Sequence, residues 1–396
     1  MDPRVLEIMT PWFLTPSNAG SRTHVYGQRA KDAVENARKQ IADLIGAKPE
    51  EIFFTSGATE SNNTAILGLQ QYAERTGRRH IISTSIEHKA DLEPLERMKQ
   101  LGFEVDLAPV ACGGYVEPET NQSLLRPDKL LVTVMRANHE NGILQPVHKI
   151  DELIAASGSR FNHNVPRHSV AGSVALKTLF HTDAAQTFGK EVDALKVLSC
   201  DMMSISGHKI YGPQGIGALY VRRHGIQKRP VEPLLYGGGQ ERGLRPGTVP
   251  VALAVGLGEA TRLAGLEWKQ RRTAAEKTRA DLLRALENVE HFINGDATRS
   301  QPHVLNVCFP GIDSEALMMS LRDQMAISNG SACTSSSYTA SHVLIAMFSH
   351  HYRIECSIRI SFEPQRRYDW LCELKNAVEL FSRSQSGETA TRSFAR

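Results

Sequence analysis

The chain has 396 residues, of which 41% are hydrophobic, so it can bury a large core and is expected to form two domains. Its formal charge of +3, from 46 basic and 43 acidic side chains, is too balanced to predict a nucleic-acid or membrane surface, and a local basic group such as Arg222, Arg223, Lys228 and Arg229 is more often a solvated face. Because no apolar run is long enough to span a bilayer and the first residues do not resemble a signal peptide, we expect a cytoplasmic protein without direct nucleic-acid or membrane contact.

The six cysteines stand at positions 112, 200, 308, 333, 356 and 372, and none of them forms a Cys-x-x-Cys pair. This spacing predicts neither a zinc ribbon nor a disulfide framework, and it fits a reducing compartment. We therefore expect no metal site. Cysteine is usually a buried small hydrophobe, which is the expectation for every thiol except Cys333.

Residues 1–27 are expected to be irregular, because three prolines and two glycines interrupt any regular element. Apolar residues then recur at the spacing of one buried helical face, which predicts a helix over 28–45. A short strand is predicted at 51–54, followed by a turn at Gly57 and a helix over 60–69. A glycine turn that opens a helix directs unpaired backbone N–H groups at one place, which suits a phosphate, although many such turns bind nothing.

Further strands are predicted at 81–85, 105–110 and 130–135, separated by stretches that can hold helices. This alternation predicts an α/β fold with a mostly parallel sheet covered on both faces, and binding sites in such sheets lie at the carboxyl ends of strands. A helix over 148–156 precedes a connection at 157–177, which is longer than the usual ~2 to 6 residues. A disordered excursion, a lid and a partner-docking loop all remain open for that connection.

Two charged residues then follow strand ends. An apolar strand from Leu179 carries Asp183, and a second strand beginning at Asp201 delivers Lys209 into a loop of glycines and proline before a strand at 217–223. Either residue alone has an ordinary explanation, a helix N-cap for the carboxylate and a solvated cation for the lysine. Together they fit a pyridoxal phosphate enzyme, in which a lysine bonds the cofactor and an acid keeps the ring nitrogen protonated.

The last third of the chain begins with a long helical stretch over 251–289. Strands are predicted at 304–309 and 358–362, and a closing helix at 367–381. The expected division is a large domain at 1–250, a smaller C-terminal α/β domain at 251–381 and a polar, disordered tail at 382–396.

Several motifs occur in a fixed order along the chain: Thr55 to Ser61, Glu87-His88-Lys89, His181 to Gln186, Ser206 to Gly212, Gly237 to Arg242, Arg245 to Thr248 and Ser331 to Ser335. With these motifs the chain resembles the cysteine desulfurases, which are fold-type I pyridoxal phosphate enzymes of the aminotransferase class V superfamily. The resemblance covers almost the whole chain. It implies pyridoxal 5'-phosphate as cofactor, L-cysteine as substrate, a sulfur-acceptor protein as partner and a homodimer as the active unit.

The resemblance also implies a set of cofactor residues. Lys209 bonds the cofactor and moves the substrate proton, Asp183 pairs with the ring nitrogen, and His88 stacks on the ring as a further catalytic residue. The remaining implied contacts are Gln186 to the ring hydroxyl, Ala58, Thr59, Ser206 and His208 to the phosphate, and Thr248 to the phosphate of the other subunit.

For the substrate, the resemblance implies that Arg359 binds the carboxylate, a task suited to a bidentate guanidinium. Asn138 and His139 stand where the family usually has two asparagines, so a substrate-side role is implied for the pair and the part played by His139 is open. Cys333 lies in a small, polar segment, 328–337, that is expected to be mobile, and it matches the thiolate that takes the sulfur as a persulfide.

Within the family, three segments look most like the Dnd-type desulfurases, which supply sulfur for DNA phosphorothioation: 17–27, 237–245 and 328–337. Sulfur supply for iron-sulfur clusters or tRNA thiolation remains open, as does a selenocysteine lyase with the same cofactor site. A scaffold that keeps the fold without catalysis is the alternative from another functional class, and the presence of Lys209, Asp183 and Cys333 argues against it.

Overall fold

The computed structural model describes residues 1–15, 18–21, 23–161, 177–223, 229–330, 340–348, 351–363 and 370–393. The chain divides into two compact units. The first unit comprises Met1–Ala108, Glu117–Arg136 and Gln145–Trp268, and the second comprises Pro109–Val116, Ala137–Leu144 and Lys269–Arg396. The expected domains at 1–250 and 251–381 stay a prediction, because these units are defined by contacts between distant segments, which a linear pattern does not reveal.

The first unit is built on a seven-stranded sheet in the order β1-β7-β6-β5-β4-β2-β3. All neighbouring strands are parallel except β7, which runs antiparallel to both β1 and β6. The predicted α/β fold with a mostly parallel sheet is therefore confirmed. The strands are β1 (Ile52–Thr55), β2 (His80–Thr84), β3 (Glu104–Ala108), β4 (Lys129–Thr133), β5 (Leu179–Asp183), β6 (Met202–Ser206) and β7 (Gly217–Val221).

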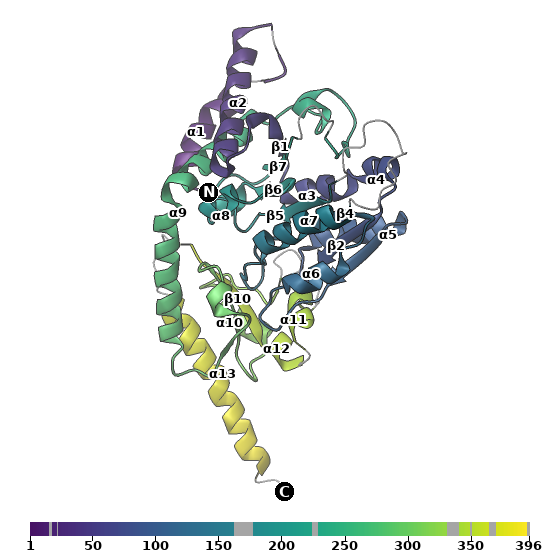
Figure 1. Cartoon of the computed structure of the whole chain (residues 1–396). Coiled ribbons are helices and arrows are strands. Elements are labelled where there is room, and N and C mark those ends of the chain that lie inside the picture. Colours follow the sequence, from purple (N-terminus) through teal and green to yellow (C-terminus); the bar gives the residue numbers. More distant parts are fainter. Residues whose placement is uncertain are drawn as a thin grey trace. The chain divides into compact units, whose positions relative to one another are not determined.

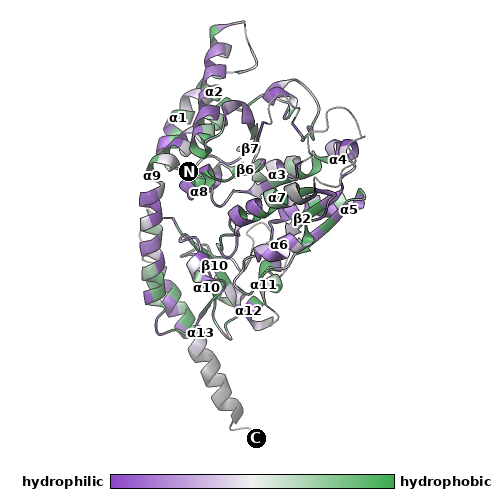
Figure 2. Ribbon diagram, viewed as in Figure 1, coloured by the Kyte–Doolittle hydropathy of each residue, from purple (hydrophilic) through white to green (hydrophobic). Residues whose placement is uncertain are grey.

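Helices cover this sheet (Figure 1). Helix α2 packs on β1, and helix α3 packs on β6 and β7, where its Ile66 shares a buried core with Leu131 and Leu219. Helix α4 is itself largely hydrophilic, as the hydropathy colouring shows (Figure 2). The helices are α2 (Val25–Ile45), α3 (Ala58–Leu67), α4 (Gln70–Thr76), α5 (Lys89–Gln100), α6 (Pro118–Leu124), α7 (Val147–Phe161) and α8 (Val192–Lys196), with 3-10 turns η1 (Pro49–Glu51), η3 (His208–Ile210) and η4 (Gln240–Gly243).

The irregular start predicted for residues 1–27 is wrong, because helix α1 spans Pro3–Leu14 and α2 begins at Val25. Pro3 occupies the first turn of α1, where a missing N–H costs nothing, and the Asp2 carboxylate caps the helix by accepting the Arg4 N–H at 2.9 Å. The Asp2 N–H donates to the carbonyl of Tyr211 at 2.9 Å, so the start of α1 is fixed to the loop that follows Lys209.

Helix α9 (Val251–Ala285) continues from the first unit into the second. The second unit holds a three-stranded antiparallel sheet in the order β10-β9-β8, with a core of its own that includes Leu305, Phe309 and Ile358. Its elements are β8 (Phe292–Ile293), η5 (Ala297–Arg299), β9 (Val304–Cys308), α10 (Ser314–Leu321), α11 (His342–Met347), α12 (His351–Glu355), β10 (Ser357–Ser361) and α13 (Trp370–Ser393).

Helix α13 is longer than the predicted closing helix and takes in most of the segment expected to be a tail. A polar segment can prolong a helix, because each added residue gains a backbone hydrogen bond without the cost of a new nucleus. Across the described residues, no helix is long and apolar enough to cross a membrane.

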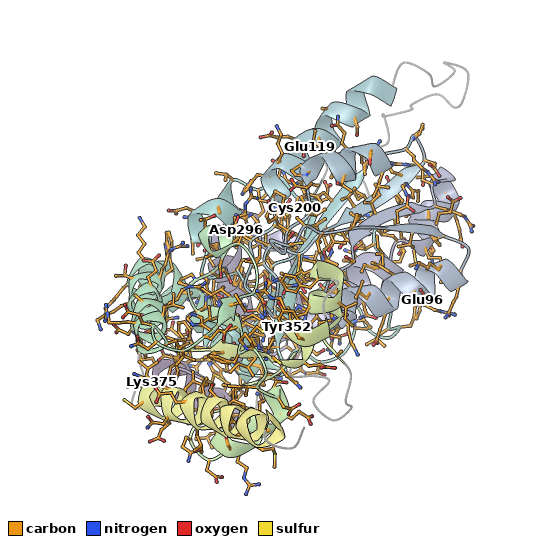
Figure 3. The ribbon with its side chains drawn as sticks, turned by 90° about the horizontal axis from the view of Figure 1, so that it is seen from below. Glu96, Glu119, Cys200, Asp296, Tyr352 and Lys375 are labelled. Atoms are coloured by element: carbon orange, nitrogen blue, oxygen red, sulfur yellow. The ribbon has the colours of Figure 1, made fainter. Side chains whose placement is uncertain are left out.

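The buried-thiol prediction is correct for Cys200, Cys308 and Cys356 and wrong for Cys112 and Cys372, which are exposed. Cys200 lies among the interior side chains, whereas Glu96 of α5 points outward (Figure 3). Burial raises the pKa of the Cys200 thiol to about 12, so this thiol stays protonated at neutral pH.

Candidate active site

The carboxyl edge of the large sheet gathers most of the predicted cofactor residues in the first unit. Strands β1 and β6 both end at this edge, and β7 begins between them, with Gly217 in register with Thr55 on one side and Ser206 on the other. A Cβ atom at Gly217 would lie 2.7 Å from the Cα of Gly57, so only glycine lets the turn after β1 approach β6. The two predicted halves of the phosphate site are thereby brought side by side.

The first half of the phosphate site is the N-terminus of α3, which begins at Ala58 immediately after Gly57. Its first backbone N–H groups have no partner within the helix and point out of its end, as the sequence predicted. Thr59 is exposed there, and the Glu60 carboxylate accepts the Ser56 N–H at 2.7 Å and the Nε–H of Arg245 at 3.1 Å, which lowers the pKa of Glu60 despite its burial. The turn is therefore fixed from both sides.

The second half consists of Ser206 at the end of β6 and His208 in η3. The Ser206 hydroxyl lies 3.1 Å from Nδ1 of His208, so the two side chains are already joined. Burial and the neighbouring lysines 190 and 209 lower the pKa of His208. A neutral imidazole and a hydroxyl can each donate a hydrogen bond to a phosphate oxygen.

Asp183 ends β5 and is almost fully buried. Its Oδ1 accepts the Ala185 N–H at 2.8 Å, and its Oδ2 accepts an Nδ2–H of Asn62 at 2.9 Å. The bond to Ala185 closes a turn, and the helix N-cap alternative is wrong because the next helix, α8, begins at Val192. The bond to Asn62 of α3 orients the carboxylate as well. Burial also lowers the pKa of His181, two residues earlier, to about 4, so that imidazole is neutral.

His88 follows β2 and is the N-cap of α5. Its Nδ1 accepts the Ala90 N–H at 3.0 Å, which places the ring proton of the neutral tautomer on Nε2. His88 therefore has a structural role as the cap of α5. The predicted stacking on the cofactor stays a prediction. Capping is compatible with it, because the bond at Nδ1 fixes the orientation of the ring.

Lys209 lies in η3, directly after Ser206 and His208, and is half-buried. The loop closes at Tyr211 with φ 65, a left-handed conformation that is uncommon for a residue other than glycine. A second lysine, Lys190, interacts electrostatically with Lys209, and its pKa is lowered to about 7 by burial first and then by the Lys209 charge. Sequence reasoning missed Lys190, because it lies outside the motifs.

The structure gives less information on three further predicted site residues. Gln186 is half-buried in the turn after β5, and Thr248 is exposed beyond η4. Cys333 lies outside the described residues.

The predicted substrate residues form a separate group in the second unit. One guanidinium N–H of Arg359, on β10, donates to the backbone carbonyl of His139 at 3.2 Å, which brings these two residues together as predicted. The His139 ring lies 3.5 Å from the Glu140 carboxylate. Asn138 has a role that the sequence did not reveal: its side-chain oxygen accepts the N–H groups of Glu140 at 2.8 Å and Asn141 at 3.1 Å, and so shapes the turn.

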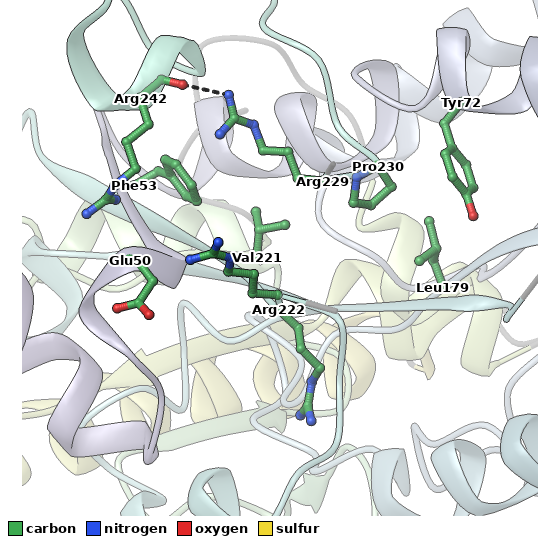
Figure 4. Close-up of a pocket in the computed structure, with 10 residues that line it drawn as sticks. Glu50, Phe53, Tyr72, Leu179, Val221, Arg222, Arg229, Pro230 and Arg242 are labelled. Carbon is green, nitrogen blue, oxygen red and sulfur yellow. Dashed lines mark hydrogen bonds between the residues drawn. The ribbon is translucent and has the colours of Figure 1, made fainter. Parts of the chain in front are cut away.

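A separate cavity of about 410 Å³ opens at the opposite edge of the large sheet, where β7 ends at Val221 (Figure 4). The predicted solvated basic face is correct for the exposed Arg223 and wrong for Arg229, which is half-buried with its guanidinium 5.3 Å from the Phe53 ring centroid. The Arg229 Nη2–H donates to the carbonyl of Arg242 at 2.8 Å. Lys228 lies outside the described residues. The cavity is lined by Glu50, Phe53, Tyr72, Leu179, Val221, Arg222, Arg223, Arg229, Pro230 and Arg242. Because parallel-sheet sites lie at the carboxyl edge, this cavity is not the cofactor site.

The residues of the first unit fit pyridoxal phosphate. A helix N-terminus with Ser206 and His208 suits a phosphate dianion, and the buried Asp183 carboxylate suits a protonated ring nitrogen. Lys209 follows β6, the strand next to β5, so an amine for the cofactor aldehyde is on the same sheet edge.

Known proteins are similar over nearly the whole chain. A family model described as aminotransferase class-V matches residues 1–162 and 170–368. The chain is 44% identical to a protein named "Cysteine desulfurase, mitochondrial" from Arthroderma benhamiae, over 97% of this chain and 73% of that protein. It is 40% identical to "Cysteine desulfurase IscS" from Photorhabdus laumondii, over 94% of this chain and 89% of that one. The crystal structure of DndA from Streptomyces lividans is 43% identical with a TM-score of 0.78, over 91% of this chain and 96% of that chain.

Proposed function

Because the chain belongs to the class-V aminotransferase family, we propose that it is a pyridoxal-phosphate-dependent cysteine desulfurase that converts L-cysteine to L-alanine and an enzyme-bound persulfide. The observation that carries this function is the convergence, on one sheet edge, of the buried Asp183, the loop lysine Lys209 and the cradle of Ser206, His208 and the α3 N-terminus. Relatives named cysteine desulfurase, 40–44% identical over most of the chain, supply the reaction type.

When bound, pyridoxal phosphate supplies an electron sink for the bonding electrons of the substrate Cα–H group. The α3 N-terminus, Ser206 and His208 hold the phosphate, and Asp183 keeps the ring nitrogen protonated. The Lys209 amine takes the proton from the substrate Cα and later returns a proton to Cα. His88, with its orientation fixed by the bond from Ala90, covers the ring.

Arg359 binds the substrate carboxylate, and the Cys333 thiolate attacks the substrate sulfur. A sulfur–sulfur bond forms as the bond between the substrate Cβ and its sulfur breaks, and the electron pair of the broken bond passes to the substrate carbon skeleton. A proton added to Cβ then completes alanine. The sulfur stays on Cys333 as a persulfide, so no external oxidant is needed for this half of the cycle.

We further propose a cytoplasmic homodimer in which Thr248 reaches the phosphate of the other subunit, and an acceptor protein that receives the persulfide sulfur. The exposure of Thr248 agrees with such a reach. For the pathway we propose sulfur supply for DNA phosphorothioation, which rests on the resemblance of three segments to Dnd-type enzymes and on the 43% identity to DndA. Transfer of the persulfide sulfur only to an iron-sulfur scaffold or a tRNA-thiolation protein would refute this pathway and leave the desulfurase intact.

The assignment of Lys209 can be tested by reducing the cofactor-loaded protein with borohydride and mapping the labelled peptide. The label should lie on Lys209 and be absent from Lys209→Ala. Lys190→Ala is the matched control, because the lowered pKa of Lys190 makes it the competing amine in the described structure. A label on Lys190, or a protein without visible absorbance after addition of pyridoxal phosphate, would contradict the proposed function and favour the scaffold alternative.

A further inference from the structure

The buried surroundings of Asp183 contain a second carboxylate and an amide that no catalytic role uses. Asn62 lies on α3, Asp91 lies on α5, and neither side chain is exposed to solvent. One Nδ2–H of Asn62 donates to Asp91 Oδ2 at 2.7 Å, and the other donates to Asp183 Oδ2 at 2.9 Å. Asn62 is four residues after Ala58, so one face of α3 carries both the phosphate end and this amide.

We propose that Asn62 and Asp91 are positioning residues for Asp183, with the Asn62 amide holding the Asp183 carboxylate and Asp91 fixing the orientation of that amide. This inference rests on the proposed function, because it assigns Asp183 the ring nitrogen. It adds two helix residues that the motifs do not contain.

The amide has one workable orientation. A flipped Asn62 would turn its carbonyl oxygen toward the Asp183 carboxylate, which cannot donate a hydrogen bond, and would lose the contact that holds Asp183. In the observed orientation, Asn62 Oδ1 and Asp91 Oδ1 are buried and have no hydrogen-bond partner within the described part of the chain. A buried unpaired acceptor costs about 1–3 kcal/mol, so this arrangement is maintained against a local penalty. Such a penalty is typical of a site whose geometry serves a function.

Three titratable groups lie around Asp91. Asp183 and Glu87 are carboxyl groups that disfavour ionisation of Asp91, and His181 Nδ1 lies 4.0 Å from Asp91 Oδ1. Burial holds His181 neutral by lowering its pKa to about 4, so its imidazole does not compensate these carboxyl groups. Burial raises the pKa of Asp91 well above its ordinary value, and Asp183 and then Glu87 raise it further.

The raised pKa favours the protonated form of Asp91, whose carbonyl oxygen can accept the Asn62 N–H without placing a second negative charge beside Asp183. Within the described residues, no three His, Cys, Asp or Glu side chains are arranged to hold a metal ion. The chain of contacts runs from Asp91 through Asn62 to Asp183 and ends at the ring nitrogen.

The protonation of Asp91 can be tested on the cofactor-free protein by infrared difference spectroscopy. Subtracting the spectrum of Asp91→Asn from that of the wild type should reveal the carbonyl stretch of a protonated carboxyl group at neutral pH. Loss of an ionised-carboxylate band alone would overturn this part of the proposal. Since no cofactor is present, this result does not depend on the proposed function.

The positioning role can be tested on the loaded enzyme with Asn62→Leu and the matched control Asn63→Leu. Asn63 is the next residue on α3, and among the described residues its amide donates to the Thr59 carbonyl of its own helix, at 2.9 Å. We expect Asn62→Leu to lower kcat about tenfold or more, equivalent to about 1.4 kcal/mol, with little change in KM, because Asn62 does not contact the substrate. The pH titration of the visible cofactor band should shift in Asn62→Leu and not in Asn63→Leu.

The Asp91 variants keep the test decisive if Asn62→Leu does not fold. Asp91→Leu removes the acceptor and should alter the visible titration as Asn62→Leu does. Asp91→Asn should restore most of the wild-type titration, because a carboxamide oxygen can accept the same N–H without charge. Equal spectra and equal kcat for Asp91→Leu and Asp91→Asn would overturn the proposal. A wild type that forms no alanine would instead refute the proposed function.

Discussion

At the scale of single residues, the charged groups of the site were easier to predict from the sequence than the residues that position them. Sites in parallel sheets form at strand ends, so the sequence could place Asp183 and Ser206, which end strands, and Lys209, which follows one. Asn62 and Asp91 could not be placed, because each lies inside a helix whose apolar period already accounts for burial. Asp91 could be singled out only as a carboxylate on the buried face of its helix, a position that needs a partner.

Glu87 gives a prediction at this scale. Its carboxyl group is fully buried, accepts the Thr84 hydroxyl at 2.6 Å and the Met135 N–H at 2.9 Å, and has a pKa raised by burial to about 8 from an ordinary 4.5. Because the folded-state pKa is raised, its contribution to stability is complete below pH 4.5 and is lost as the pH rises through about 8.

We expect the free energy of unfolding of the wild type to fall relative to Glu87→Gln between about pH 5 and about pH 9, by up to about 1.4 kcal/mol for each pH unit. Urea denaturation of both proteins across this range measures the difference. Parallel stability curves would mean that Glu87 is ionised in the folded protein or that its proton is not linked to folding.

At the scale of elements, periodicity and strand-end motifs predicted most of the fold. The sheet strands lie within one or two residues of their expected starts, because apolar runs bounded by glycine and polar residues are strong signals. Helix α1 was missed because Pro3 and Pro11 were interpreted as breakers, although Pro3 stands in the first turn. The burial of Val5 and Met9 of α1 depends on contact with distant segments, which the sequence pattern does not contain.

The register of β1, β7 and β6 gives a second prediction. A methyl group at Gly217 would meet the backbone oxygen of Ile205 and the Gly57 carbonyl carbon, the latter at 2.8 Å, and backbone atoms cannot move as side chains do. Gly217→Ala should therefore lower the melting temperature of the cofactor-free protein and weaken inorganic phosphate binding.

Gly239→Ala is the matched control, because its added methyl group meets no atom within 4 Å and its φ of -84 suits alanine. Calorimetry should show the melting temperature of this control close to that of the wild type. A Gly217→Ala protein as stable as the control would mean that the turn after β1 is not held against β6.

At the scale of the whole molecule, the longer connection after α7 marks where this chain departs from the family model, which leaves 163–169 unmatched. Removing 163–169 should preserve alanine formation, because the family fold is complete without those residues. Removing the wider range 157–177 should destabilise the protein instead, because Lys177 pairs with the buried Asp201 at 3.2 Å and its carbonyl accepts from Arg78 at 3.0 Å.

Steady-state alanine production and melting temperatures of the two deletion variants measure this contrast. Loss of cofactor binding in the shorter deletion would give the connection a role in the site. The sequence could not show that 137–144 belongs to the second unit, because this assignment depends on contacts between distant residues, such as that of Arg359 with His139.

The central claim, that the chain takes sulfur from cysteine onto Cys333, is tested most directly by mass spectrometry after a single turnover. The cofactor-loaded protein is mixed with L-cysteine without reductant, alanine is quantified, and the cysteine peptides are analysed for added sulfur. The exposed Cys112 and Cys372 serve as internal controls for non-specific sulfur exchange. We predict alanine in proportion to the added sulfur, with that sulfur on the Cys333 peptide and no persulfide in Cys333→Ser. Added sulfur on Cys112 or Cys372, or undiminished sulfur delivery by Cys333→Ser, would contradict the account.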